Sequence, residues 1–110
     1  MGKHTLGEFE LIVMLAVMHL GEDEAHPLAI VDSIRERAGR RVQRAAVHVT
    51  LQRLEHKGLV SSWLSEPRPE RGGKGRRQVK LTRAGAAAVN DARAALEGMW
   101  SGLASARSSK

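Results

Sequence analysis

The sequence predicts a mainly α-helical fold with a small β-hairpin. Two observations predict it: amphipathic segments with helical spacing occupy the first half and the end of the chain, and two β-prone segments between them flank a stretch rich in Gly and Arg. A chain of 110 residues with 42% hydrophobic residues can build one compact core. We expect a folded domain at 1–83, followed by a helix and a frayed tail at 84–110.

The first helix is expected at about residues 6–20. Thr5 and Glu8 have the spacing of a capping box, and apolar side chains then recur at helical intervals. Gly21 is expected to end this helix, and an acidic loop with the sequence GEDEA follows it. Pro27 predicts the start of a second helix, because its fixed φ suits a first helical turn.

Glycines delimit the next two helices. The second helix is expected to end before Gly39, which supplies a left-handed cap, and the third is expected at about 44–57 with Gly58 as its stop signal. On the third helix, the inward face is expected to consist of Val47, Leu51 and Leu54. The outward face then consists of Ala45, Val49, Gln52, Arg53 and His56, with His48 at the border.

The segment RPERGGKGRRQVKLT, residues 68–82, distinguishes between two functions. A phosphate-binding Walker loop requires G-x-x-x-x-G-K followed by Ser or Thr, but here the Gly-Lys pair at 73–74 precedes another Gly, and Arg68 stands where the first Gly is needed. The segment lies instead between predicted strands at 59–65 and 78–81, where glycines allow the chain to reverse. We interpret it as the tip of a basic hairpin.

The last helix is expected to begin after Thr82, whose side chain can cap it. Its apolar residues follow a three-four spacing, which is typical of the seam of a short coiled coil. The seam either closes the core of its own chain or pairs with a second copy. We favour the second copy, because a long terminal helix on so small a domain needs cover. The predicted homodimer interface consists of Val89, Ala92, Leu96, Met99, Trp100 and Leu103.

Charge is unevenly distributed along the chain. The net charge is +6, but residues 1–34 contain one Lys and six acidic residues, whereas residues 35–83 contain 14 Lys and Arg and four acidic residues. A cationic middle segment is expected of a protein that binds a polyanion, above all nucleic acid. The alternative is a basic surface that only promotes solubility.

Three helices followed by a two-stranded hairpin is the element order of a winged helix-turn-helix. In that fold the third helix enters the DNA major groove, and the hairpin contacts the backbone or the minor groove. Gln52 and Arg53, with His48 and Val49, are then the residues expected to read bases. The other predicted DNA-binding residues, chiefly for phosphates, are Arg40, Arg41, Gln43, Arg44, Lys74, Arg76 and Arg77.

Three segments carry a family resemblance and together span about residues 6–85: LGEFELIVMLAVMHLGEDEA, AAVHVTLQRLEHKGLV and EPRPERGGKGRRQVKLTRAG. They resemble the first helix and loop, the recognition helix with its following strand, and the wing of PadR-type transcriptional regulators. The LxRLExKGLV core and a wing followed by LTxxG are fairly specific in this order. The chain departs from the family at His48, where Tyr is usual, and at Gln78 and Val79, where aromatic residues are common.

The resemblance implies a homodimer of winged helices, joined through residues 84–104, that represses nearby genes until an effector or stress signal releases it. Some members of the family stack a Trp of this helix on a planar ligand. Trp100 is therefore a candidate site for a planar aromatic effector, although packing in the dimer interface is the simpler role. The alternative function is a winged-helix adaptor for protein or RNA, since a fold alone does not determine function.

Other chemistry is not indicated. The chain has no Cys, and its five His lack H-x-x-x-H spacing, so we expect neither a disulfide nor a metal site. No nucleophile, base and orienting group can be assembled, so we expect no enzymatic activity and no cofactor. The longest apolar stretch, LIVMLAVMHL, is about half of a membrane span. We expect no membrane anchor and a cytoplasmic location.

Overall fold

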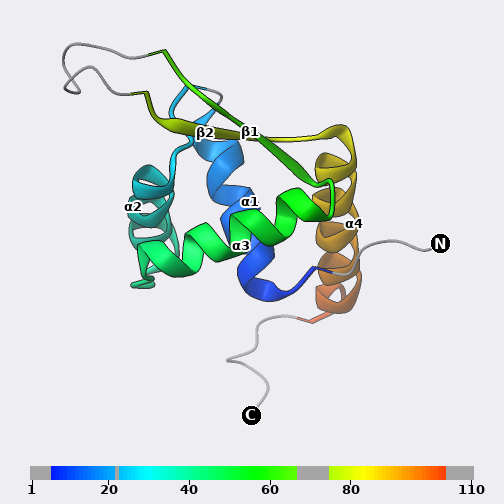
Figure 1. The fold of residues 1–110 in the computed structure, drawn as a ribbon. Helices are drawn as coiled ribbons and strands as arrows, with labels where there is room; N and C mark the ends of the chain where they lie inside the picture. The colour runs from blue at the N-terminus through cyan, green and yellow to red at the C-terminus, as the bar shows by residue number, and fades with distance from the viewer. Residues whose placement is uncertain (1–5, 22, 67–74, 104–110) are drawn as a thin grey trace.

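Figure 1 shows the computed structural model, which describes residues 6–21, 23–66 and 75–103. This is the predicted mainly helical fold with one antiparallel hairpin. Among the described helices, none is both long and apolar enough to cross a membrane. The elements are α1 (Glu8–Leu20), α2 (Pro27–Ala38), α3 (Arg44–His56), β1 (Val60–Leu64), β2 (Arg77–Leu81) and α4 (Arg83–Trp100).

The N-terminus of α1 is capped differently from the prediction. Gly7 is the N-cap residue, and its N–H donates to Oε1 of Glu10 at 3.0 Å. The reciprocal hydrogen bond of a capping box is therefore made by Glu10, three residues after the N-cap. Glu8, the partner expected for Thr5, instead binds Arg40.

The glycines act at the ends of α2 and α3 as predicted. Gly39 has a φ of 65°, and its N–H donates to the carbonyl of Arg35 at 3.1 Å. Lys57 is the C-cap of α3, and Gly58, with a φ of 78°, turns the chain into β1. At both positions a side chain would be strained, because left-handed backbone brings Cβ too close to the following carbonyl oxygen.

The hairpin is attached to the helices along β2. The register runs from Val60 opposite Leu81 to Leu64 opposite Arg77. On the other edge of β2, the N–H of Val79 donates to the carbonyl of Ala25, in the α1–α2 loop, at 2.9 Å. This bond anchors the wing strands beside the start of α2, as Figure 1 shows. The predicted wing tip at 68–74 lies outside the described residues.

The core lies between α1, α2, α3 and the hairpin. The three residues predicted for the inward face of α3 are all buried. One residue of α4, Val89, is also buried in this core, with 5% of its surface exposed. The largest fully buried side chains are Met14, Ile30, Ile34, Leu54, Leu59, Val13, Val47 and Val79.

The last helix begins as predicted but ends early. Thr82 caps α4, because its Oγ1 accepts a hydrogen bond from the N–H of Gly85 at 3.0 Å. The prediction that the helix extends to about 104 is wrong: Ser101 leaves helical geometry with a ψ of 134°, and Gly102 follows with a φ of 88°. Glycine weakens a helix by up to about 1 kcal/mol relative to Ala, which explains this end. Leu103 therefore lies beyond α4.

Candidate nucleic-acid interface

The outward face of α3 carries the side chains predicted to read bases. His48, Val49, Gln52 and Arg53 are all exposed, and Val49 is an exposed apolar residue with 51% of its surface accessible. These residues recur at spacings of three and four, so they follow one side of the helix while Val47, Leu51 and Leu54 hold the other side in the core. The structure thus presents this set on one surface.

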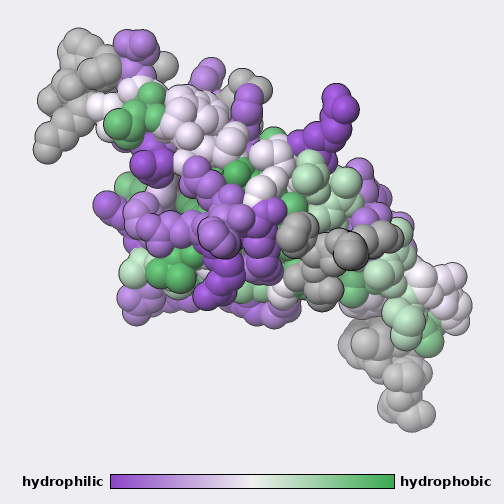
Figure 2. Space-filling model, turned by 45° about the vertical axis from the view of Figure 1, so that its right-hand side comes forward, coloured by the Kyte–Doolittle hydropathy of each residue, from purple (hydrophilic) through white to green (hydrophobic). Residues whose placement is uncertain are grey.

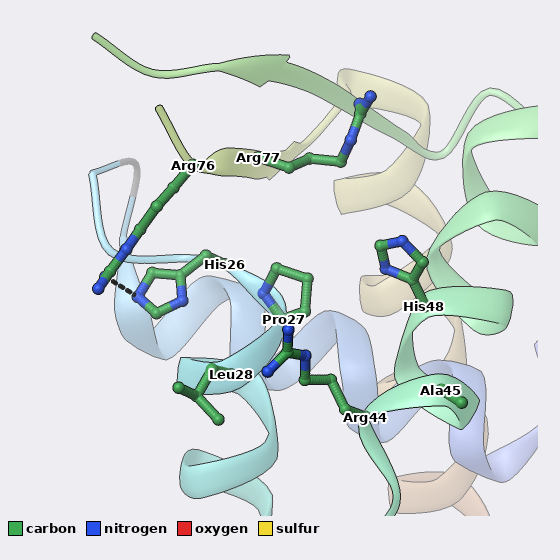
Figure 3. Close-up of a pocket in the computed structure, with 8 residues that line it drawn as sticks. All are labelled: His26, Pro27, Leu28, Arg44, Ala45, His48, Arg76 and Arg77. Carbon is green, nitrogen blue, oxygen red and sulfur yellow. Dashed lines mark hydrogen bonds between the residues drawn. The ribbon is translucent and has the colours of Figure 1, made fainter. Parts of the chain in front are cut away.

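A basic cavity of about 550 Å³ lies beside this face, between the starts of α2 and α3 and the wing. Figure 3 shows that the side chains come from three parts of the chain: α2 and its cap, the first turns of α3, and the start of β2 with the residue before it. The Arg44 side chain projects toward Pro27 across the cavity, and His48 lies on the side of the cavity opposite His26 and Arg76. The lining residues are His26, Pro27, Leu28, Arg44, Ala45, His48, Arg76 and Arg77.

His26 joins the wing to the start of α2. It is the N-cap residue of α2, and its Nδ1 accepts from the N–H of Ala29 at 3.4 Å. Its Nε2 lies 2.7 Å from Nη1 of Arg76, the contact drawn in Figure 3. Free backbone N–H groups and the helix dipole favour anions at a helix N-terminus. Arg76 is therefore held where the start of α2 already favours a negative group.

The remaining predicted phosphate contacts are more scattered. Arg41 and Gln43 are exposed in the α2–α3 loop. Arg40 is engaged within the protein, because its Nη2 lies 2.9 Å from Oε1 of Glu8 on α1. It does not line the basic cavity. Lys74 lies outside the described residues, so its predicted contact is not placed.

A second hollow, of about 300 Å³, separates α3 from the hairpin. It is lined in part by His48, Gln52 and Glu55 of α3 and by Ser62 and Arg77 of the strands. Nη1 of Arg77 donates to Oγ of Ser62 at 2.6 Å, and that hydroxyl donates to the carboxylate of Glu55 at 3.0 and 3.1 Å. Glu55, Ser62 and His26 were not among the predicted site residues, because no local pattern marks contacts across 7 to 50 positions.

An ion pair under the far end of α3 fixes this helix against α1. Nζ of Lys57 donates to Oε2 of Glu10 at 2.9 Å, and only 10% of the Glu10 side chain is exposed. Burial raises the pKa of Glu10, but hydrogen bonds from the Gly7 N–H and the Lys57 ammonium, with the positive charges of Lys57 and Arg53, outweigh it and leave the pKa below its usual 4.5. The carboxylate is thus ionised at neutral pH.

An apolar groove of about 470 Å³ lies on the other side of the molecule, between α1 and α4. Val89 is at its buried edge, whereas Leu96 and Trp100 are 49% and 59% exposed. Met99 is 78% exposed, and Ala92 is half-buried. Figure 2 shows green apolar residues toward the right and lower right of the molecule, away from the strongly hydrophilic surface at its centre. The groove is completed by Leu11, Leu15 and Met18 of α1.

Comparison with known proteins identifies the fold. The chain resembles a PadR-like transcription factor from Bacteroides fragilis, at 24% identity and a TM-score of 0.68, over 83% of this chain and 82% of that one. It also resembles a PadR family regulator from Clostridium difficile, at 18% identity and a TM-score of 0.71, over 84% and 91% of the two chains. The Bacillus subtilis PadR in complex with operator DNA matches at 14% identity and a TM-score of 0.63, over 78% and 46%.

The family assignment rests on the sequence as well. No curated protein matches the chain. The model of the transcriptional regulator PadR-like family, however, matches residues 14–91, which include α2, α3 and both wing strands. Because this match spans most of the chain, and the fold is that of the solved PadR structures, the protein belongs to the PadR-like family of DNA-binding transcriptional regulators and is not an enzyme.

Proposed function

We propose that the protein is a cytoplasmic, homodimeric repressor of a pseudo-palindromic DNA operator. The observation that carries the proposal is the basic cavity, where Arg44, His48 and Arg76 meet the start of α2 directly beside the exposed face of α3. A DNA backbone strand seated there would place α3 in the adjacent major groove. The Bacillus subtilis PadR, which shares this fold, is known in complex with operator DNA, and this supports DNA as the partner.

The basic cavity and the outward face of α3 contribute differently to DNA recognition. Arg41, Arg44 and Arg76 contact phosphates, which supply affinity without sequence preference. Gln52 and Arg53 reach base edges, since an amide pairs with adenine and a guanidinium with guanine. The ion pair of Arg40 with Glu8 offsets its positive charge, so we expect Arg40 to contribute less to phosphate binding than Arg44.

Matched substitutions test this division. Arg53→Ala should relax the base preference at one position of each half-site, whereas Arg44→Ala should weaken all duplexes alike and reduce the salt slope by about 1.8, because each of the two protomers loses one phosphate contact. Arg35→Ala is the control, because Arg35 is paired with Asp32 on the exposed side of α2 and its loss removes the same charge. The operator used in these measurements is identified by selecting genomic DNA fragments that the wild-type protein binds. If Arg44→Ala and Arg35→Ala behave alike, or if the wild type prefers no duplex, the proposal is wrong and an adaptor role is favoured.

A second copy of the chain is the proposed occupant of the α1–α4 groove. Contiguous exposed apolar surface marks interaction sites, and Leu96, Met99 and Trp100 expose theirs on the helix beside this groove. A two-fold dimer also suits DNA, because two α3 helices one helical turn apart require a palindromic site. Sedimentation should show a dimer for the wild type, and a monomer at micromolar concentration would contradict the proposal.

Release by a planar aromatic compound is proposed for the same groove. Trp100 and Leu96 both line it, and the indole is 59% exposed, so a flat ligand can stack on it. Trp63→Phe leaves Trp100 as the sole fluorescent indole. Planar dyes should then quench its emission and lower operator affinity together. Quenching that leaves the affinity unchanged would remove the regulatory role.

A further inference from the structure

Arg77 differs from the other cations of the interface in how it is held. Its Nη1 donates to Oγ of Ser62 at 2.6 Å, and Ser62 uses its single proton to bind both carboxylate oxygens of Glu55, at 3.0 and 3.1 Å. The hydroxyl therefore accepts from Arg77 and donates to Glu55, so it links the two charged side chains. Figure 3 shows that the Arg77 guanidinium is turned up toward β1, whereas the Arg44 guanidinium projects toward Pro27.

Glu55 is an unusual residue for this surface. It lies in the last turn of α3 and lines the same hollow as His48 and Gln52, the candidate base-reading residues. A free carboxylate there would repel DNA phosphates. Through Ser62, the positive charge of Arg77 offsets it, so the pair adds almost no net charge to the interface. Arg77 accordingly cannot contribute to non-specific affinity as a free Arg does.

The fixed position of Arg77 has a second effect. A long flexible side chain loses rotamer freedom when it binds, and an immobilised one loses less. The remaining N–H donors of Arg77 point from a constant place between α3 and the wing. These donors favour a DNA site with a hydrogen-bond acceptor within their reach, and they add no affinity for a random duplex that lacks one. The neutralised charge and the fixed position of Arg77 thus both raise operator affinity relative to random-duplex affinity.

We propose that Glu55 and Ser62 are positioning residues that hold Arg77 as a specificity determinant and withhold it from indiscriminate phosphate binding. This inference rests on the proposed DNA binding, because it describes how the same surface discriminates among sequences. It predicts that the clamp raises the ratio of operator affinity to random-duplex affinity, and that breaking it releases a phosphate-binding cation.

Three variants separate the clamp from ordinary packing. Ser62→Ala breaks the link and leaves the net charge unchanged, whereas Ser62→Thr restores the hydroxyl on a strand that tolerates β-branched residues. Glu55→Gln removes the charge of the carboxylate. Glu36→Gln is the control for charge, since Glu36 is exposed near the C-terminal end of α2. Each protein is titrated with operator and random duplexes by fluorescence anisotropy at several salt concentrations.

The expected results are specific to the clamp. Ser62→Ala should lower the operator-to-random ratio by about fivefold or more, on the scale of one lost base contact, and Ser62→Thr should retain most of it. Glu55→Gln should steepen the salt slope on random duplex by about 1.8, the value for one added phosphate contact in each protomer of the dimer. Glu36→Gln should change the slope by less than half as much. In an Arg77→Ala background, Ser62→Ala should have no further effect on the ratio.

The inference and the proposed function fail in different ways. If the wild type discriminates between duplexes but Ser62→Ala keeps its ratio, the clamp has no role in specificity. The same conclusion follows if Ser62→Ala lowers the ratio equally with and without Arg77, because the serine then acts through another residue. If the wild type binds operator and random duplex alike at every salt concentration, DNA discrimination itself is refuted and the clamp falls with it.

Discussion

Replacement of Lys57 by Met tests whether the ion pair to Glu10 holds α3 on α1. Loss of one partner of a fully buried pair costs about 3–5 kcal/mol, and a surface pair contributes at most about 1. The Glu10 side chain is 10% exposed and that of Lys57 is 28% exposed, so this pair lies between the limits. One hydrogen bond to Glu10 also remains, from Gly7. We therefore expect Lys57→Met to lower the free energy of unfolding by about 2 kcal/mol at pH 7.

The stability lost in Lys57→Met should depend on pH in a defined direction. The pKa of Glu10 is lowered in the folded protein, so its contribution to stability is present above the unfolded pKa and is lost as pH falls through the folded pKa. The difference between wild type and Lys57→Met should accordingly shrink below about pH 4. Chemical denaturation at a series of pH values measures it. Arg40→Met is the control, because the Arg40–Glu8 pair has the same 2.9 Å separation but is largely exposed. Equal losses for both variants, or a loss that persists unchanged at pH 3, would refute the reasoning.

Three further predictions concern α4. Gly85→Ala should destabilise the protein by about 1–3 kcal/mol in thermal unfolding, because its Cβ would collide with the carbonyl oxygen of Leu59, whereas Gly98→Ala meets open space and should stabilise by about 0.5–1 kcal/mol; stabilisation by both would be inconsistent with this packing. Thr82→Ala should cost about 0.5–2 kcal/mol by loss of the N-cap, and an unchanged melting temperature would argue against the cap. Leu96→Asp should convert the dimer to monomer in sedimentation without lowering helix content, since it places a charge at the apolar groove. A dimer that stays intact would show that the interface does not include this groove.

The elements were predictable wherever a local signal specifies them. Gly39 and Gly58 follow the ends of α2 and α3 with positive φ angles, which glycine adopts without help from distant residues. Thr82 caps α4 through a hydrogen bond to a residue three positions away. The outward face of α3 followed from helical periodicity alone. Even the local signals competed at one end, where Gly7 with Glu10, and not Thr5 with Glu8, caps α1.

The interior of the candidate site was not predictable, because it depends on distant pairs. Arg40 looks like a free cation in the sequence, but the fold brings Glu8 to it from 32 residues away. The contact between His26 and Arg76 spans 50 residues, and no spacing in the sequence marks it. Val89 was predicted for the dimer seam from its heptad position, yet packing against the core already covers it. A repeat pattern shows which residues share a helix face, but it does not show what covers that face.

The most direct test of the central claim is the salt dependence of operator binding, measured with stoichiometry. A labelled duplex carrying the selected operator, and a scrambled duplex of equal length, are titrated by fluorescence anisotropy from low to moderate salt. We predict two protomers per operator and a logarithmic salt slope of roughly −5, which corresponds to about three phosphate contacts from each protomer. A single protomer per duplex, a slope near zero, or equal affinity for both duplexes would contradict the account.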